Sequence, residues 1–269
     1  MKIATWNINS VRLRIDLVVR FLKEEAPDVL CLQEIKCREG EFPAKPLATA
    51  GYVHQAVSGQ AGYHGVAIVS KLPLADVSRR AFCGKADARH IEATLPGGVR
   101  LHNFYVPSGG DEPDPRVNEK FGHKLDFMKD MADWFAGMGA PKRQKSVLVG
   151  DLNVAPREHD VWSHRQLLGV VSHTPVEVDH LAGVQGSHDW IDVARELIPE
   201  PEKIYTWWSY RSPNWRGSNR GRRLDHIWVS PSLKSAALGA GRGAFAVHDR
   251  CRDWKRPSDH APVTLTLGL

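Results

Sequence analysis

Short apolar runs that end in an acidic or amide side chain recur along this whole chain, and they constrain its fold more than any other feature. The polar residues in or just after such runs are Asn7, Glu34, Asp151, Asn153 and Asp225, and we expect them to be partners of Asp259 and His260 near the end of the chain. Because these segments are far apart in sequence, only a chain that folds as one unit can bring the side chains together at one edge. Oxygen ligands with one histidine suit a hard metal ion such as Mg²⁺ and a phosphate ester.

The 269 residues contain no linker, internal repeat or low-complexity tract, so we expect a single domain that spans residues 1–269. No run of about 18 apolar residues is present, and the N-terminal residues enter strand-like sequence without a secretory segment. The four cysteines have no CxxC spacing, which predicts reduced thiols and disfavours zinc. We therefore expect a cytoplasmic protein that has no membrane partner.

The net charge of +5 is modest, but one segment concentrates positive charge. Residues 211–223 carry five arginines and no acid, and four aromatic residues precede them within residues 205–210. Such a mixture suits a surface that holds phosphates and stacks on bases. The alternative is a solvated loop beside an aromatic core cluster, but the position directly before Asp225 favours the nucleic-acid surface. The candidate DNA-binding residues here are Trp207, Trp208, Arg211, Arg216, Arg220 and Arg222.

Periodicity indicates a mixture of helical crossovers and hairpin-like links. The expected strands are residues 2–7, 29–33, 65–70, 91–95, 99–106, 146–149, 224–229 and 262–267. The expected helices are residues 13–22 with Ser10 as N-cap, residues 118–138 and residues 190–197. This pattern predicts an α/β protein in which two packed mixed sheets are flanked by helices.

Two strand ends carry the acids that matter most. Glu34 follows residues 29–33, where a carboxylate in apolar surroundings is costly unless it is paired or bound to metal. We favour a metal ligand over a salt-bridged structural glutamate.

Asp151 and Asn153 are two residues apart, so an extended segment would place both on one side. Asp151 could then accept a proton while Asn153 donates its amide to a phosphate oxygen, although Gly-Asp-x-Asn is also good turn sequence.

Asp259 and His260 cannot form an oriented pair with each other, because neighbours on a strand point to opposite faces. We expect His260 to take its orienting carboxylate from Asp225, which would favour the imidazolium form. Asp259 can then face the metal. Most of the other histidines, His102 among them, have no neighbours in sequence that suggest a site.

Two further polar residues end apolar strands. Asn7 offers an amide to the metal surroundings or to Glu34, and the alternative is a turn residue at a strand end. Tyr105 precedes a glycine-rich loop and could donate its hydroxyl to a phosphate, although a tyrosine on a strand more often serves packing.

Together these segments resemble the exodeoxyribonuclease III family of DNA-repair nucleases, within the endonuclease/exonuclease/phosphatase superfamily. The matching pieces occur in family order from end to end. They are Trp6-Asn-Ile-Asn9, Leu32-Gln-Glu34, Gly62-Tyr-His-Gly-Val-Ala67, Asn103-Phe-Tyr-Val-Pro107, Gly150-Asp-Leu-Asn-Val-Ala155, Tyr205-Thr-Trp-Trp-Ser-Tyr-Arg211, Arg223-Leu-Asp225 and Ser258-Asp-His-Ala-Pro-Val263.

The resemblance implies a four-layer α/β sandwich, a divalent metal (Mg²⁺, with Mn²⁺ as an alternative) and hydrolysis of duplex DNA on the 5′ side of abasic sites. It also implies removal of blocking groups and mononucleotides from 3′ ends. Nothing in the sequence indicates an obligate protein partner, so we expect a monomer. Glu34 is similar to the main metal ligand, with Asn7, Asp259, Asp151 and Asn153 around it.

The resemblance further implies catalytic roles. Asp151 is similar to the residue that activates water, Asn153 and Tyr105 to groups that hold the scissile phosphate, and His260 with Asp225 to a pair that stabilises charge on the phosphate. Whether the general base is the aspartate or the histidine stays open.

Two departures from the family pattern bear on the substrate. Ser108 stands where some relatives carry an asparagine that contacts phosphate, and Arg222 stands where human-type relatives carry a tryptophan beside the abasic sugar. The second departure leaves the balance between endonuclease and exonuclease activity open. The alternatives to a DNA nuclease are a phosphatase for inositol phosphates or lipids and a catalytically inactive nucleic-acid-binding module.

Overall fold

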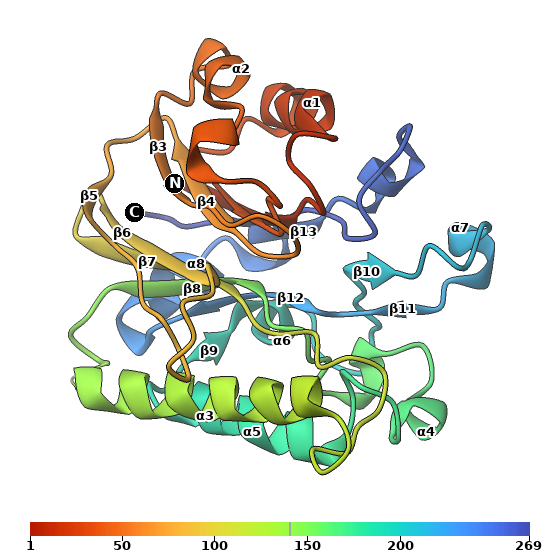
Figure 1. Cartoon of the computed structure of the whole chain (residues 1–269). Helices are drawn as coiled ribbons and strands as arrows, with labels where there is room; N and C mark the ends of the chain where they lie inside the picture. The colour runs from red at the N-terminus through yellow and green to blue at the C-terminus, as the bar shows by residue number, and fades with distance from the viewer. Residues whose placement is uncertain (140) are drawn as a thin grey trace.

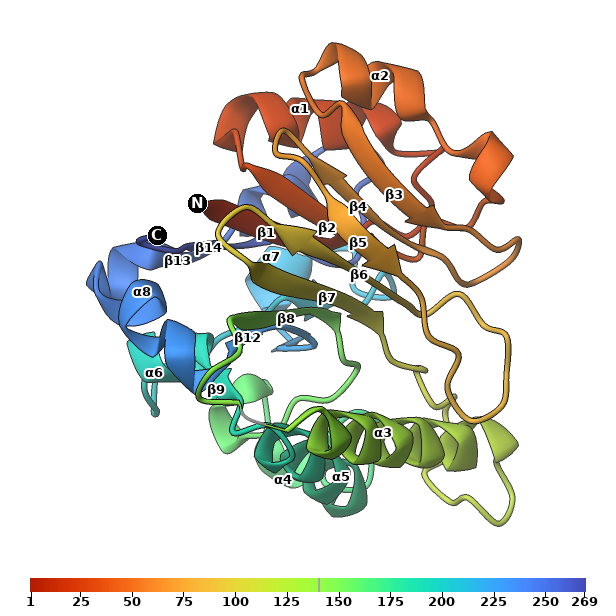
Figure 2. The same cartoon turned by 90° about the vertical axis from the view of Figure 1, so that its left-hand side faces the viewer.

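Two six-stranded sheets lie face to face between two layers of helices in the computed structural model, which describes residues 1–139 and 141–269 (Figure 1). Strands β1 and β2 pair in parallel, as do β7 and β8, whereas the other neighbours are antiparallel. The predicted α/β sandwich of two packed mixed sheets flanked by helices is therefore confirmed. Figure 2 shows the same four layers from the side.

The first sheet has the strand order β13-β14-β1-β2-β4-β3. Its strands are β1 (Lys2–Asn7), β2 (Val29–Gln33), β3 (His54–Ser58), β4 (Val66–Ser70), β13 (Phe245–Val247) and β14 (Val263–Thr266). Helices α1 (Ile15–Glu25) and α2 (Ala44–Thr49) cover its outer face. The outer side chains Trp6 and Leu32 pack there against Phe21 of α1, and all three are buried.

The second sheet has the strand order β5-β6-β7-β8-β12-β9. Its strands are β5 (Ala75–Ser78), β6 (His90–Leu95), β7 (Val99–Tyr105), β8 (Ser146–Asp151), β9 (Ile191–Asp192) and β12 (Asp225–Val229). The long helix α3 (Glu119–Met138) and helix α5 (Pro175–Gly186) cover its outer face. Asn118, the first residue of the predicted helix, is the N-cap of α3 and accepts from the backbone N–H of Lys120.

The remaining elements lie at the edges of the sandwich. They are α4 (His164–Leu167), α6 (Val193–Leu197), α7 (Trp215–Ser218), α8 (Lys234–Leu238) and the two-stranded sheet of β10 (Trp207–Trp208) and β11 (Gly221–Arg222). None of the helices that the structure describes is both long and apolar enough to cross a bilayer.

The facing sides of the two sheets share one apolar core. Ile3 and Ile68 of the first sheet and Val149 and Ile227 of the second belong to the same buried cluster. Because helices cover the outer faces as well, the central strands are apolar on both sides, which explains their nearly continuous apolar sequence. The assignment of residues 1–269 to a single domain stays a prediction, and the shared core supports it.

Two predicted helix boundaries are wrong. Ser10 is not a helix cap, because its N–H donates to the carbonyl of Glu34 and its φ of 84° is left-handed, so α1 begins only at Ile15. The segment 190–197 is helical only in its second half. Its residues Ile191–Asp192 form the edge strand β9 against β12, and a two-residue strand has no periodicity that the sequence could reveal.

Helix α5 was not predicted, although its start has a readable signal. Thr174 and Glu177 form a capping box in which each side chain satisfies a backbone N–H of the other, and Pro175 occupies the first turn. The spacing Thr-Pro-Val-Glu is a common helix start. The hydrophobic pattern that follows is weak, which is why periodicity alone missed it.

The glycine before Asp151 has a packing reason. Gly150 has φ 140°, and a Cβ at this position would lie 2.0 Å from the carbonyl oxygen of Phe104 on the neighbouring strand. Only glycine lets β8 end this close to β7, so the turn at Gly-Asp-Leu-Asn depends on it.

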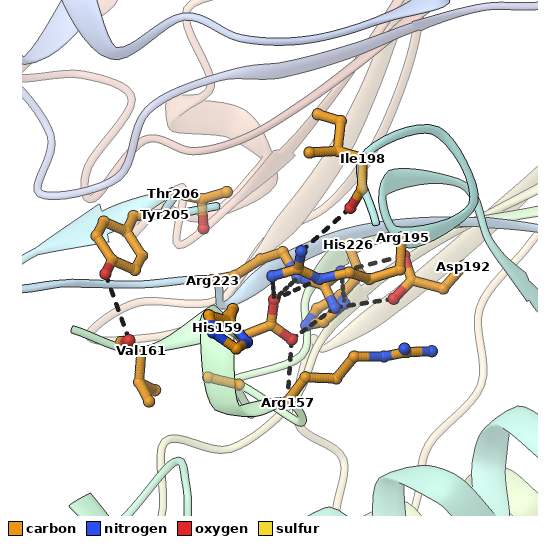
Figure 3. Close-up of polar contacts among 12 residues, drawn as sticks. Arg157, His159, Val161, Asp192, Arg195, Ile198, Tyr205, Thr206, Arg223 and His226 are labelled. Carbon is orange, nitrogen blue, oxygen red and sulfur yellow. Dashed lines mark hydrogen bonds and ion pairs between the residues drawn. The ribbon is translucent and has the colours of Figure 1, made fainter. Parts of the chain in front are cut away.

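A buried ion network fixes the chain directly before Asp225 (Figure 3). Arg223 is fully buried and donates to both oxygens of Asp160, at 2.8 Å each, and to both oxygens of Asp192. Arg195 donates to the same Asp160 at 3.0 and 2.5 Å. Burial alone would raise the pKa of Asp160, but the two arginines lower it to about 2. The network anchors the start of β12, which carries Asp225 into the site.

We expect Asp160→Ala to destabilise the fold by about 3–5 kcal/mol, because it leaves two buried guanidinium groups without their shared carboxylate. The pKa of Asp160 lies near 2, below its ordinary 3.8, so its contribution is present above about pH 4 and is lost as the pH falls toward 2. Urea unfolding at pH 7 and at pH 3 measures both effects. Asp133→Ala, in an exposed pair on α3, is the control that should change little. An equal loss in the two variants would contradict the network's role.

Candidate active site

The ends of strands from both sheets meet at one rim of the sandwich. β1 ends at Asn7 and its parallel neighbour β2 ends just before Glu34. On the second sheet β8 ends at Asp151, and β12 begins directly opposite it at Asp225. The side chains that the sequence placed at strand ends are therefore neighbours in space.

Glu34 is the centre of a hydrogen-bond network that joins the two sheets. Its Oε1 accepts from the Asn7 amide and from the Tyr105 hydroxyl, at 2.9 Å each. The same Asn7 amide nitrogen donates to Asp151 Oδ2 at 2.8 Å. The ammonium of Lys36 lies 2.9 Å from Glu34 Oε2. This carboxylate therefore already attracts a positive charge on the side that faces the site.

Burial raises the pKa of Asp151 to about 7. The negative charges of Asp225 and Glu34 add to the rise, whereas His260 and the amide of Asn7 oppose it. A carboxyl group with this pKa can gain or lose a proton near neutral pH, which is the property a general base needs. Burial also raises the pKa of Tyr105, so its hydroxyl keeps its proton and acts as a donor.

His260 lies between two carboxylates. Its Nδ1 is 2.8 Å from Asp225 Oδ2 and its Nε2 is 3.7 Å from Asp151 Oδ2. Burial alone would lower its pKa, but the two carboxylates raise it to about 10. The ring is therefore an imidazolium at neutral pH, with one N–H held by Asp225 as the sequence predicted and the other directed toward the site.

Asp259 lines the cavity and is hydrogen-bonded to Asn9, a residue that the sequence did not single out. The Asp259 carboxylate accepts from Asn9 Nδ2 at 3.0 Å and from the Trp207 indole at 2.9 Å. Burial opposes ionisation, but the positive His260 and these hydrogen bonds lower the pKa of Asp259. Asn9 also accepts from Lys36 at 2.6 Å. The spacing of Asn9 two residues after Asn7 could have identified it.

Asn153 reaches the site through a bend and not through an extended segment, so the predicted extended geometry is wrong. Its φ of 54° is left-handed, and its backbone N–H donates to Asp151 Oδ1 at 3.0 Å. Its side-chain amide donates to the carbonyl of Val106 at 2.8 Å and to Asp151 Oδ2 at 3.2 Å. The turn that the sequence allowed as an alternative brings Asn153 beside Asp151.

An open cavity of about 980 Å³ adjoins these groups. The predicted site residues that line it are Glu34, Ser108, Asn153, Trp207, Trp208, Arg211, Arg220, Arg222, Asp259 and His260. Trp207 is half-buried and directed into the rim, whereas Trp208 is only 4 % exposed and its indole donates to Asn219. Trp208 therefore mainly supports the wall. Arg216 does not line the cavity and pairs with Asp249 and Asp253 on the surface.

Arg222 is held in the cavity wall by neutral partners. Its guanidinium donates to the carbonyl of Val171 at 2.8 Å and to the hydroxyl of Ser172 at 2.7 Å, and it lies 5.3 Å from the centroid of the Trp207 ring. Burial lowers its pKa only from the high value of a guanidinium, so it stays charged. A positive charge without a hydrogen-bonded carboxylate in this wall favours anionic substrates.

The donor set fits a hard divalent cation. Glu34 and Asp259 both present carboxylate oxygens to the cavity, and Asn7 and Asn153 add amide groups. Oxygen-rich surroundings of this kind suit Mg²⁺ or Mn²⁺ and not a thiolate-bound metal. Lys36 forms an ion pair with Glu34, as the alternative of a salt-bridged glutamate requires, and the Glu34 carboxylate also lines the cavity where a cation could bind.

His102 is a buried structural histidine, in keeping with the expectation from sequence, and it has acidic and basic neighbours in space. It lies across from Glu92 on the outer face of the second sheet, with its Nδ1 2.9 Å from that carboxylate and 3.4 Å from His90 Nε2. Glu92 is also bound by Ser78 and Arg100. Burial lowers the pKa of both histidines. None of His90, Glu92 and His102 lines the cavity, and His102 packs against Trp134 and Phe135 of α3.

Comparison with known proteins gives the class. The model of the Endonuclease/Exonuclease/phosphatase family matches residues 4–260, and the chain belongs to this family. The chain is 32% identical to Exodeoxyribonuclease III of Haemophilus influenzae over 98% of both proteins. It superposes on an AP endonuclease from Archaeoglobus fulgidus with a TM-score of 0.90 and 31% identity over the full length of both chains. A 3′ phosphatase from Neisseria bound to a product DNA hairpin gives a TM-score of 0.88 and 33% identity over 99% of each chain.

In the metal-free protein we expect the His260 ring to stay charged up to about pH 10, because Asp225 and Asp151 stabilise the imidazolium. Asp225→Asn should lower the pH at which this ring loses its proton. NMR titration of the imidazole nitrogens measures both values, with Asp249→Asn on the distant surface as the control. A neutral His260 at pH 7.5 in the wild-type protein would contradict the electrostatic description of the site.

Proposed function

We propose that this chain is a divalent-metal-dependent DNA-repair nuclease of the exodeoxyribonuclease III type. It cleaves the phosphodiester on the 5′ side of abasic sites in duplex DNA, and it removes phosphates, other blocking groups and nucleotides from 3′ ends. The observation that carries the proposal is the continuous chain of contacts Asp225–His260–Asp151–Asn7–Glu34 at the edge of a cavity lined by arginine and tryptophan.

The geometry and the shifted pKa values of the two central residues support different roles for them. With a pKa near 10, His260 is already protonated at neutral pH and cannot accept a proton, but its Nε2–H can donate to a phosphoryl oxygen. Asp151, with a pKa near 7, can accept the proton of an attacking water. The alternative assignment of His260 as the general base is therefore disfavoured.

The neighbouring residues orient the phosphate. Asn153 and Tyr105 carry neutral donors beside Asp151 and Glu34, where extra negative charge develops on the phosphate. Fixed donors at such a position stabilise the transition state. Glu34, with Asn7 and Asp259 adjoining it, would hold Mg²⁺, with Mn²⁺ as the alternative. When bound, the ion neutralises charge on the phosphate and polarises its oxygen.

The cavity wall indicates the substrate class. Trp207 offers an aromatic face, and Arg211, Arg220 and Arg222 supply positive charge beside it. This combination fits a duplex with a displaced lesion or a 3′ end better than a small or lipid phosphoester. A cytoplasmic location and a monomeric state without an obligate protein partner are part of the proposal and rest on the sequence features alone.

We expect Asp151→Asn and His260→Ala each to lower turnover on an abasic-site duplex by about 10²–10³-fold, because each removes a group that acts in the transition state. Duplex binding should persist. Rates at saturating DNA, together with binding by fluorescence anisotropy, measure the two properties separately. Near-normal turnover in either folded variant would refute the assigned roles.

Trp207→Ala should slow cleavage of the abasic-site duplex more than hydrolysis of a small chromogenic phosphodiester. Stacking on a base is worth about 1–3 kcal/mol, or about 5- to 150-fold. The lost hydrogen bond to Asp259 affects both substrates, so the ratio of the two rates isolates the DNA contact. Trp254→Ala, outside the cavity, is the control. An unchanged ratio would exclude Trp207 from DNA recognition.

A further inference from the structure

A fully buried ion pair lies beneath the floor of the cavity, between helices α3 and α5. Lys124 of α3 and Glu177 of α5 each have 0 % exposed side chains, and their charged groups are in direct contact. Neither residue lines the cavity. Lys124 and Glu177 are therefore not among the reacting groups. Their hydrogen bonds nevertheless reach the backbone of Asn153, which lies beside Asp151.

The ammonium of Lys124 has three donors, and all three have partners. One donates to Glu177, one to the backbone carbonyl of Asn153 at 2.7 Å and one to the carbonyl of Ser108 at 3.3 Å. Asn153 is held in the left-handed conformation, where a non-glycine residue needs support from its surroundings. Lys124 thus supports both the residue beside Asp151 and the loop that follows β7.

Glu177 connects the pair to the opposite wall. Its two carboxylate oxygens accept from the backbone N–H of Ser172, at 2.9 Å each, and from the N–H and hydroxyl of Thr174. The hydroxyl of Ser172 in turn accepts from Arg222, which packs over Trp207. A single hydrogen-bonded chain therefore runs from Asn153 through the ion pair to the arginine–tryptophan wall.

The stability of the fold does not by itself explain why a charged pair, and not an apolar pair, occupies the buried positions of Lys124 and Glu177. Replacing a buried ion pair with apolar residues is often neutral or stabilising, because removing two charges from water is costly. The directional bonds from the ammonium to two backbone carbonyls are what an apolar pair could not supply. They act on the segments that carry Asn153 and Ser108.

We propose that Lys124 and Glu177 form a positioning pair that fixes the Asn153 turn against the Arg222–Trp207 wall and so holds the Asn153 amide, which donates to Asp151 and to the carbonyl of Val106, at the edge of the reacting site. The inference rests on the proposed nuclease function. Neither residue of the pair touches the substrate. Each contributes to the catalytic rate only because it positions Asn153.

The first test compares Lys124→Met with Lys129→Met, an exposed lysine on the same helix. We expect Lys124→Met to lower kcat on the abasic-site duplex by about 10- to 100-fold with little change in KM, since small displacements at a reacting centre have effects of this size. Lys129→Met should match the wild type. If Lys124→Met does not fold, the double variant Lys124→Met/Glu177→Gln, which leaves no unpaired buried charge, takes its place.

The decisive readout is a double-mutant cycle with Asn153→Ala, because a purely structural defect would not depend on Asn153. If the pair acts through Asn153, removing Lys124 should cost less than about twofold in kcat once Asn153 is alanine. Independent losses that multiply in the combined variant, or a wild-type kcat in a folded Lys124 variant, would overturn the proposal. A wild-type protein without cleavage of abasic or 3′-blocked DNA would instead refute the function on which it rests.

Discussion

The contact on which the site depends most is made by one amide nitrogen. Asn7 Nδ2 donates to Glu34 of the first sheet and to Asp151 of the second. Asn7 is fully buried, so the geometry of this contact is set by how the two sheets pack and not by a surface loop. The carboxylates of Glu34 and Asp151 therefore have a separation that the packing of the two sheets fixes.

Side chains of the same chemical type have different pKa values in this site because their surroundings differ. Asp151 has a raised pKa because it is buried near other acids, whereas Asp259 has a lowered pKa because a charged histidine and two donors face it. His260 is charged because two carboxylates surround it. Outside the site, the arginines around Asp160 hold the start of β12. In the proposed mechanism, residues of the same kind therefore differ in role, in proton transfer, in cation binding or in support of the fold, because their surroundings differ.

The layered α/β fold and the grouping of acids at one rim could be predicted from the sequence, because apolar strands that end in polar residues leave few other arrangements. The pairing of His260 with Asp225 was also predicted, although Asp259 and His260 lie before β14 and not on a strand as the prediction assumed. Other features were not. The turn at Asn153 had a local signal in Gly-Asp-Leu-Asn, but the sequence could not show that the Asn153 carbonyl accepts from the buried Lys124. The burial of Trp208 depends on packing partners that are distant in sequence, for which the local sequence carries no signal.

The most direct test of the account uses a 5′-labelled duplex with one abasic-site analogue, incubated with Mg²⁺ and with EDTA beside an intact duplex. The account predicts a single nick on the 5′ side of the lesion that requires Mg²⁺. Cleavage that persists in EDTA, or no cleavage of the abasic duplex in Mg²⁺, would contradict it.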